Sequence, residues 1–235
     1  MRLIYRTILI TVIPVFLLSI ERGYTQMLGN TIHSLRPNEV AFGIAVESMH
    51  RHMDVGSFSS SRLMLKGSYG ITGWWTISGM GGGANMYFNP PAGSLLSNFR
   101  GTFEWGYGGN TRVTLINKGI EVFGFGGGLR TFSSGTVSYS LEAAKIDLRY
   151  DWREFWAGVG LLFTVRKWSL YLVGEDRAIQ WVEVTNGKTS TSGFKPNIIA
   201  GTEYPITSKF GINVQFKYLN EFAFVIGIYE RSIGL

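Results

Sequence analysis

Residues 194–235 read FKPNIIAGTEYPITSKFGINVQFKYLNEFAFVIGIYERSIGL, and side chains of two kinds alternate along this stretch. Between Phe210 and Tyr218 every second residue is large and apolar, whereas the residues between them are mainly small or polar. Because successive side chains of a β-strand point to opposite faces, a period of two predicts a strand with one apolar and one polar face. A tight link around Asn220 leads into a second apolar run, Phe222 to Tyr229, so we expect the chain to end in a hairpin.

The same alternation recurs along most of the chain. Five candidate strands precede residue 133, and five follow residue 155, at 156–165, 168–184, 195–204, 209–219 and 221–231. Short links alternate with longer ones at 48–60, 88–98, 133–155 and 185–194. Strands that alternate in this way, with short turns on one side and long loops on the other, are typical of membrane-spanning barrels. The sequence therefore predicts an all-β fold, a closed antiparallel transmembrane β-barrel with short periplasmic turns and longer extracellular loops.

The strand number follows from parity. Bacterial single-chain barrels have an even number of strands, because both ends of the chain lie on the periplasmic side. Counting 133–155 as a full strand would give an odd number, so we expect this region to be an extracellular loop or a strand extension. The prediction is about ten strands, with eight or twelve as the alternatives.

The composition favours lipid-facing strands over a soluble sheet. The 235 residues include 31 glycines and 14% aromatic residues, and only 16% are charged, against roughly 25% in ordinary soluble domains. A soluble β-sandwich, the alternative, would carry more charge on its outer faces. The formal net charge of +6 comes without dense clusters of Lys and Arg, so we expect no nucleic-acid partner. The chain has no cysteine, which excludes disulfides and a cysteine-linked lipid anchor.

The N-terminus has the pattern of an export signal. Arg2 and Arg6 make the start of the chain basic. They precede an apolar run, Ile8 to Ile20, that spans 13 residues. This length suits a signal peptide and is shorter than the roughly 20 residues of a membrane-spanning helix. We predict a signal peptide at 1–25, cleaved near Thr25, a periplasmic lead-in at 26–38 and the barrel at 39–235. An uncleaved helical anchor is the alternative.

Two hairpins carry a family resemblance. The stretches YGITGWWTISG, residues 69–79, and EYPITSKFGINVQFKY, residues 203–218, resemble hairpins of small bacterial outer-membrane β-barrels of the outer-membrane protein A, X and W types. This resemblance implies that the protein is located in the bacterial outer membrane, in contact with its lipid bilayer. It also implies that the barrel assembly machinery is a partner during insertion. It assigns no subfamily. The chain departs from the group by ending on Leu235 rather than on an aromatic residue, and the strand to Tyr229 could serve instead.

Charged side chains fall on the strand faces opposite the apolar ones. Because charges in a membrane must pair or contact water, we expect these side chains to point into the barrel. Their mixed signs predict a narrow, ion-paired lumen, with a basic pore for small anions as the alternative. The predicted lumen charges are Glu47, Arg62, Lys66, Arg100, Glu104, Glu203 and Lys217.

Aromatic residues cluster near the predicted strand ends. Tryptophan and tyrosine are enriched where a barrel meets the membrane–water interface, so an interfacial belt is the expected role. The predicted interfacial aromatics are Trp74, Trp75, Trp105, Trp156, Trp168, Tyr204 and Tyr218.

The three histidines are the available imidazole bases. His33 precedes the first strand, whereas His50 and His52 lie close to Asp54 and several serines. Alternate residues of an extended segment could converge on a metal ion, and Ser with His could form a hydrolytic pair. A solvated polar loop explains the same residues more simply, so we expect no catalytic residue, no metal and no cofactor.

The expected function is non-enzymatic, with a structural or passive-transport role and a narrow, charge-lined lumen. One alternative is a barrel that binds a partner or ligand of a surface, secretion or motility complex through the segments 48–60, 88–98 and 133–155. A less favoured alternative is a lipid-modifying hydrolase that uses His50 or His52.

Overall fold

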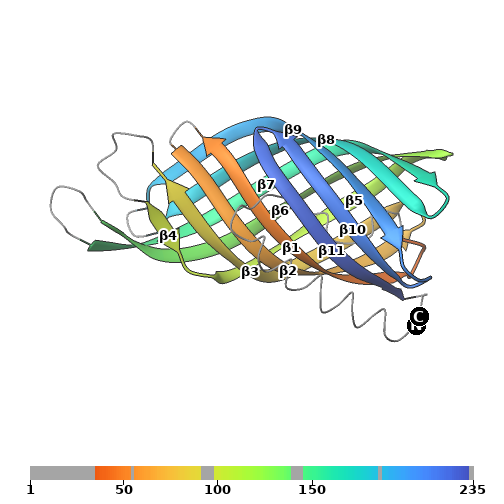
Figure 1. The fold of residues 1–235 in the computed structure, drawn as a ribbon, viewed down its shortest axis with the longest axis horizontal. Coiled ribbons are helices and arrows are strands. Elements are labelled where there is room, and N and C mark those ends of the chain that lie inside the picture. Colours follow the sequence, from red (N-terminus) through yellow and green to blue (C-terminus); the bar gives the residue numbers. More distant parts are fainter. Residues whose placement is uncertain (1–34, 54–55, 91–97, 139–144, 185–186, 233–235) are drawn as a thin grey trace.

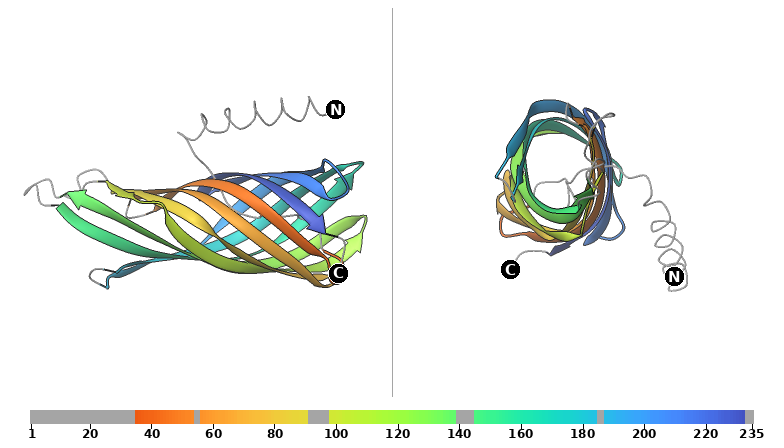
Figure 2. Two further views of the ribbon diagram at one scale, coloured as in Figure 1. Left: turned by 90° about the horizontal axis from the view of Figure 1, so that it is seen from below. Right: turned by 90° about the vertical axis from the view of Figure 1, so that its left-hand side faces the viewer.

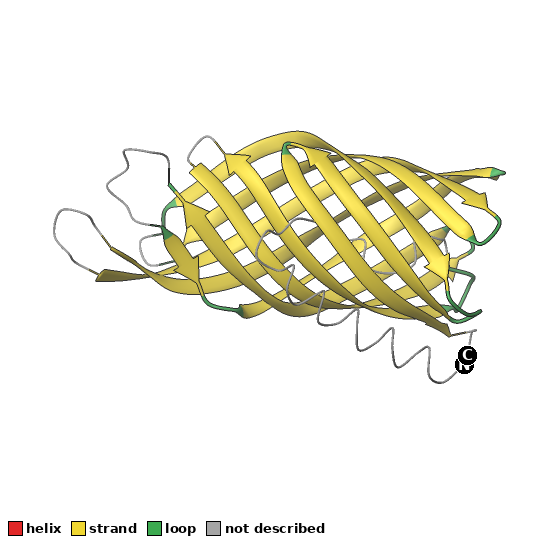
Figure 3. Cartoon of the chain, viewed as in Figure 1, coloured by secondary structure: helices red, strands yellow, loops and turns green. Residues whose placement is uncertain are grey.

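The computed structural model describes residues 35–53, 56–90, 98–138, 145–184 and 187–232. These residues form antiparallel strands joined by turns and loops (Figures 1 and 3). The strands are β1 (Val40–Met53), β2 (Gly56–Thr72), β3 (Trp75–Asn89), β4 (Phe99–Gly101), β5 (Glu104–Lys118), β6 (Ile120–Ser138), β7 (Lys145–Val165), β8 (Trp168–Glu183), β9 (Thr189–Pro205), β10 (Phe210–Leu219) and β11 (Glu221–Ser232). In the described part of the chain, no helix is long and apolar enough to cross a membrane.

The strands close into a ring, which is seen end-on in Figure 2. Apart from β4 and β5, strands that follow one another in sequence pair with each other, and β1 pairs with β11 from Val40 opposite Ser232 to Arg51 opposite Glu221. The short β4 and the longer β5 both lie between β3 and β6, so they occupy one position of the ring. The ring therefore has ten positions, which confirms the predicted closed barrel of about ten strands.

The two faces of the wall differ as the alternation predicts. Apolar side chains point outward and are largely exposed, such as Leu65 at 58% and Val159 at 61%, while the residues between them point inward and are buried. A belt of exposed apolar side chains around a closed sheet is unfavourable in water and suits contact with lipid hydrocarbon. The outer face thus identifies a barrel that spans a membrane.

The two ends of the barrel differ. Short turns at 73–74, 119, 166–167 and 206–209 lie at the end where β1 begins and β11 ends, which we call the terminal end. We call the opposite end, where β1 ends, the loop end. The strand ends that flank residues 91–97, 139–144 and 185–186 are at the loop end, while these residues themselves are outside the described ranges.

Three of the predicted loops are largely strand, and in 185–194 the strand is β9, which begins at Thr189. β1 continues to residue 53 and β2 begins at residue 56, so most of 48–60 belongs to the sheet. β6 and β7 likewise pair from Ile120 to Ser138, which makes 133–155 chiefly an extension of two strands. Beyond the lipid-facing belt the outward residues become polar, for example Ser48 and Ser134. In these strand extensions the apolar–polar alternation is therefore lost, although the strands continue.

The end of the predicted lead-in contacts the terminal end of the barrel. Leu35 is buried, and its backbone N–H donates to Thr76 Oγ1 at 3.3 Å. The N–H of Asn38 donates to the carbonyl of Gly70 at 2.9 Å. The predicted signal peptide, the lead-in up to residue 34 and the last three residues lie outside the described ranges.

Candidate functional site in the barrel lumen

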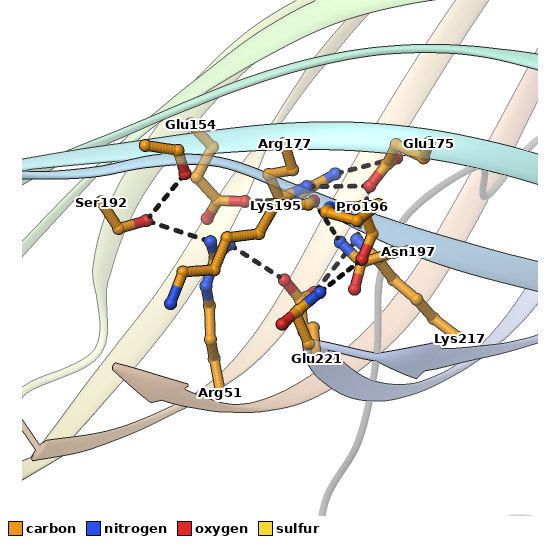
Figure 4. A network of polar contacts seen from close by, with 12 residues as sticks. Arg51, Glu154, Glu175, Arg177, Ser192, Lys195, Pro196, Asn197, Lys217 and Glu221 are labelled. Carbon is orange, nitrogen blue, oxygen red and sulfur yellow. Dashed lines mark hydrogen bonds and ion pairs between the residues drawn. The ribbon is translucent and has the colours of Figure 1, made fainter. Parts of the chain in front are cut away.

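Eight buried charges form a chain through the middle of the lumen. Four are cationic and four anionic, and neighbours in the chain have opposite signs. Figure 4 shows most of these side chains pointing toward one another from different strands. In order of contact, the central network is Glu47, Arg62, Glu154, Arg177, Glu175, Lys217, Glu221 and Arg51.

Glu154 on β7 lies at the centre of this network. Arg62 from β2 and Arg177 from β8 both donate to its carboxylate, and Trp152 Nε1 donates at 2.8 Å. β2 and β7 are not neighbours in the ring, so the pair between Arg62 and Glu154 crosses the lumen. On its other side Arg62 Nη1 lies 3.4 Å from Glu47 Oε1 on β1.

The rest of the network links β8 to β10, β11 and β1. Lys217 Nζ lies 2.5 Å from Glu175 Oε1 and 3.3 Å from Glu221 Oε1. Arg177 Nε donates to Glu175 Oε1 at 3.0 Å. Arg51 Nη1 lies 3.6 Å from Glu221 Oε2, which brings the chain of charges back to the strand that carries Glu47.

Removing a charge from water costs several kcal/mol unless it is paired, so a buried network must balance its signs. The central network has equal numbers of cations and anions. Its formal charges therefore cancel, and each side chain has an ion-pair partner on another strand or on its own strand.

Clusters of buried apolar side chains lie on both sides of the central network. Toward the loop end the rings of Phe58 and Trp152 stack with centroids 3.8 Å apart, and the cavity beside them measures only about 40 Å³. That is room for a few water molecules at most. The loop-end cluster comprises Met49, Phe58, Met86, Phe99, Val137, Trp152 and Ile179. The terminal-end cluster comprises Met64, Met80, Phe123, Phe125, Leu129, Trp156, Leu162, Tyr171, Val173 and Ile199.

Of the seven predicted lumen charges, three belong to the central network: Glu47, Arg62 and Lys217. Lys66 and Glu203 are buried on the inward face nearer the terminal end, where Tyr229 donates to Glu203 Oε1 at 2.5 Å. Glu104 lies at the start of β5, partly exposed, and accepts from the Thr102 hydroxyl at 3.2 Å.

Arg100 was expected in the lumen, and this placement is wrong. Phe99 and Gly101 point inward, so Arg100 points outward, opposite Tyr87 on β3. The sheet is interrupted at residues 102–103, and inward residues are odd-numbered in β4 but even-numbered in β5. A single alternation carried through this break assigns Arg100 to the wrong face.

Among the predicted interfacial aromatics, Trp156 is also misplaced. It is buried in the lumen, opposite Gly127 on β6, and the guanidinium of Arg177 lies 4.8 Å from its ring. Trp152, which shares the same face of β7, is buried too.

The other six aromatics point outward. Trp168 packs against the half-buried Tyr204 with ring centroids 4.7 Å apart. Trp74, Trp75, Trp168 and Tyr204 lie beside the turns of the terminal end, whereas Trp105 and Tyr218 lie in the half toward the loop end.

Sequence reasoning did not single out Arg51, Glu154, Glu175, Arg177 and Glu221, which supply most of the central network. Arg51 continues the alternation of β1 beyond the predicted strand end. Glu175 and Arg177 are two residues apart and so share one face of β8. The two-residue spacing of charges within long strands could thus have indicated these residues. Part of this spacing was missed because some predicted strands, such as the first, were too short.

His50 and His52 point outward from β1 near the loop end. Their ring centroids are 4.8 Å apart, and His50 Nδ1 lies 2.8 Å from Ser59 Oγ on β2. Asp54 and His33 are outside the described residues. Within the described ranges, no group of three or more histidine, aspartate and glutamate side chains could hold a metal ion.

Solved structures similar to this one include the barrel domains of bacterial autotransporters. One is the translocator domain of the autotransporter NalP from Neisseria meningitidis, with 10% identity, a TM-score of 0.51, and 86% of this chain and 90% of that chain covered. The chain folds as an outer-membrane β-barrel. The β domain of the Bordetella autotransporter BrkA is similar to the same degree, with 10% identity and a TM-score of 0.51. The match covers 82% of this chain and 98% of that domain.

These likenesses concern the fold of the outer-membrane β-barrel and not its activity, because the identities are low. No protein-family model and no curated protein matches the sequence. These comparisons assign no subfamily, so the role of the barrel has to be argued from its own lumen and surface.

Proposed function

We propose that this outer-membrane β-barrel is a structural, non-enzymatic protein of the bacterial outer membrane whose lumen is closed to ions and hydrophilic solutes. Its terminal end would face the periplasm and its loop end the cell exterior. The observation that supports this role is the central network, which connects six of the ten ring positions across the lumen.

A closed lumen favours a structural role over passive transport. A hydrated ion that entered the lumen would have to separate pairs such as Arg62 and Glu154 and then pass apolar side chains on both sides. Breaking one buried pair is expected to cost about 3–5 kcal/mol. Balanced charge also argues against the anion-selective pore considered from the sequence.

Solute efflux from vesicles tests this proposal. The full chain would be refolded into lipid vesicles loaded with a small charged dye, and we expect efflux no faster than from empty vesicles. The double variant Arg62→Ala/Glu154→Ala removes a pair that crosses the lumen and should increase the efflux. Rapid efflux through the unsubstituted barrel would overturn the proposal.

A matched control is the variant Arg112→Ala/Glu121→Ala. This inward pair, 2.5 Å apart, joins the adjacent strands β5 and β6 and so lies along the wall. Its removal should leave efflux close to that of the unsubstituted barrel. Equal leakage in both variants would mean that loss of any buried pair disturbs the barrel.

A second candidate function is hydrolysis of a lipid ester, favoured by the contact between His50 and Ser59. Partial burial and the neighbouring His52 lower the pKa of His50 below its ordinary value, so its imidazole is neutral at pH 7 and could accept the serine proton. In the described residues no hydrogen bond orients its other ring nitrogen, which is why we place this function second. Ester hydrolysis that is lost in Ser59→Ala and in His50→Asn would favour it over the structural role.

A further inference from the structure

Three arginines gather on the outer surface of β6 and β7 around one aspartate. Arg130 comes from β6 and Arg149 and Arg153 from β7, with Asp151 between them and Phe132 alongside. We call this group the arginine cluster. It faces away from the lumen and takes no part in the central network.

Asp151 fixes two of the three guanidinium groups. Arg130 donates through Nε and Nη2 to the two oxygens of Asp151, both at 2.8 Å, and Arg153 Nη2 donates to Oδ2 at 2.6 Å. Asp151 is buried beneath them, yet the side chains of Arg130 and Arg153 remain 39% and 38% exposed. The two cations are therefore held in place and still accessible from outside the barrel.

Arg149 adds a third cation beside the same aromatic ring. The guanidinium carbons of Arg130 and Arg149 lie 4.9 and 5.5 Å from the centroid of Phe132. In the described part of the chain, Arg149 has no ion pair. Stacking on an aromatic ring positions a guanidinium while leaving its N–H groups free to donate.

The cluster lies where the lipid-facing surface ends. The outward residues of β7 are apolar from Val165 to Phe155, and the next outward residue toward the loop end is Arg153. Tyr107 on β5, an exposed aromatic, accepts a hydrogen bond from Arg130 Nη1 at 3.3 Å. An aromatic hydroxyl and arginines at the edge of an apolar belt mark the level of lipid headgroups.

The charges of this surface do not cancel. Three arginines surround one aspartate, and the next acid, Asp147, accepts from the Thr136 hydroxyl at 2.8 Å. Thr136 is itself opposite the outward-facing Arg100, so the positive excess remains. Guanidinium groups match phosphate oxygens in charge and in the geometry of paired hydrogen bonds.

We propose that the arginine cluster binds the phosphate group of an anionic lipid in the membrane leaflet at the loop end. Arg149 and Arg153 would donate to the phosphate oxygens, with Arg130 held beside them by Asp151. The acyl chains of this lipid would lie along the apolar outward residues below, among them Phe155 and Val159.

Lipid binding by the full chain in detergent micelles tests this site. The probes are bisphosphorylated lipid A and the same lipid after enzymatic removal of both phosphates, with binding followed by native mass spectrometry. The variant Arg149→Gln/Arg153→Gln leaves the pair between Arg130 and Asp151 intact. We expect it to bind the phosphorylated lipid at least tenfold more weakly than the unsubstituted barrel.

The control variant Lys167→Gln/Lys209→Gln removes two exposed charges at the turns of the terminal end and should bind within about twofold of the unsubstituted barrel. Heat-dependent migration on gels would verify that both variants are folded. Equal binding by the two variants, or undiminished binding of the dephosphorylated lipid, would overturn the proposal. Complete displacement of the lipid by millimolar inorganic phosphate would also overturn it, because the site would then prefer a free anion.

Discussion

Glycine residues decide how closely adjacent strands can approach in this narrow barrel. Gly82 points inward from β3, and a methyl group added there would collide with the carbonyl of Leu63 and lie 2.8 Å from Met64 Cα. Both obstacles are backbone atoms of β2, so the sheet itself would have to move. Gly79 on the same strand has no atom within 4 Å of an added methyl group.

The variant Gly82→Ala is therefore expected to destabilise the barrel by about 1–3 kcal/mol, as overpacking does in other cores. Gly79→Ala should change the stability by less than about 0.5 kcal/mol, the usual range for surface substitutions. Urea unfolding in micelles, followed by tryptophan fluorescence, measures both. Equal stability of the two variants would contradict the role assigned to Gly82.

His50 gives a pH-dependent prediction. Burial and His52 lower its pKa in the folded barrel below the ordinary value of 6.5, so the unfolded chain takes up this proton first as the pH falls. The lowered pKa of His50 therefore leaves the free energy of unfolding unchanged above pH 6.5 and decreases it below pH 6.5. The imidazole signals of labelled protein should give a midpoint for His50 below 6.5, and the His50→Asn variant identifies the signal. A midpoint at or above 6.5 would contradict this environment.

At the scale of the strands, β7 carries the residue on which the lumen depends. Glu154 accepts hydrogen bonds from Arg62, Arg177 and Trp152, and so connects β2 and β8 through β7. Its loss would leave two buried cations with fewer partners.

We expect Glu154→Gln to destabilise the barrel by about 3–5 kcal/mol, because removing one partner leaves a buried charge uncompensated. Glu104→Gln is the control, since Glu104 is partly exposed and has no place in the network. Unfolding midpoints in urea compare the two. A shift no larger than that of the control would mean that water replaces the lost carboxylate.

The strands also show how far sequence reasoning reaches. Alternation predicted nearly all lipid-facing strand segments, because a lipid-contacting face must be apolar at every second residue. It failed where this constraint ends, as in the extensions of β1, β6 and β7 beyond the belt, and where the register shifts, as at Arg100. Trp156 was misjudged because an indole suits both an interfacial belt and a packed lumen, and only its position on the inward face of β7 decides between them.

The candidate site was less predictable than the fold. The sequence indicated mixed, inward-facing charges, but the partners of each charge depend on the stagger of strands far apart in the chain. Residues 62 and 154 meet because the ring closes, which no local pattern encodes.

At the scale of the whole molecule, closure rests on the pairing of β1 with β11. Met49 and Ala223 are directly opposite each other and both buried, whereas Val225 is displaced by two residues along the same face. Directly paired cysteines can form a disulfide, while those two residues apart are too distant. The natural chain has no cysteine to interfere.

The variant Met49→Cys/Ala223→Cys should therefore form an intramolecular disulfide on mild oxidation, and Met49→Cys/Val225→Cys should form far less. Faster migration of the unreduced, heated protein on gels reports the closed loop. Efficient cross-linking of the second variant instead of the first would show a different register at the closure.

The central claim is that the folded barrel spans a membrane with its lumen closed. Current recordings across a planar bilayer test it most directly, with the full chain inserted at neutral pH and moderate voltage. The closed lumen predicts no stable current steps above the bare bilayer, although insertion is verified by heat-dependent migration of the reconstituted protein. Steady, stepwise conductance through the unsubstituted barrel would contradict it.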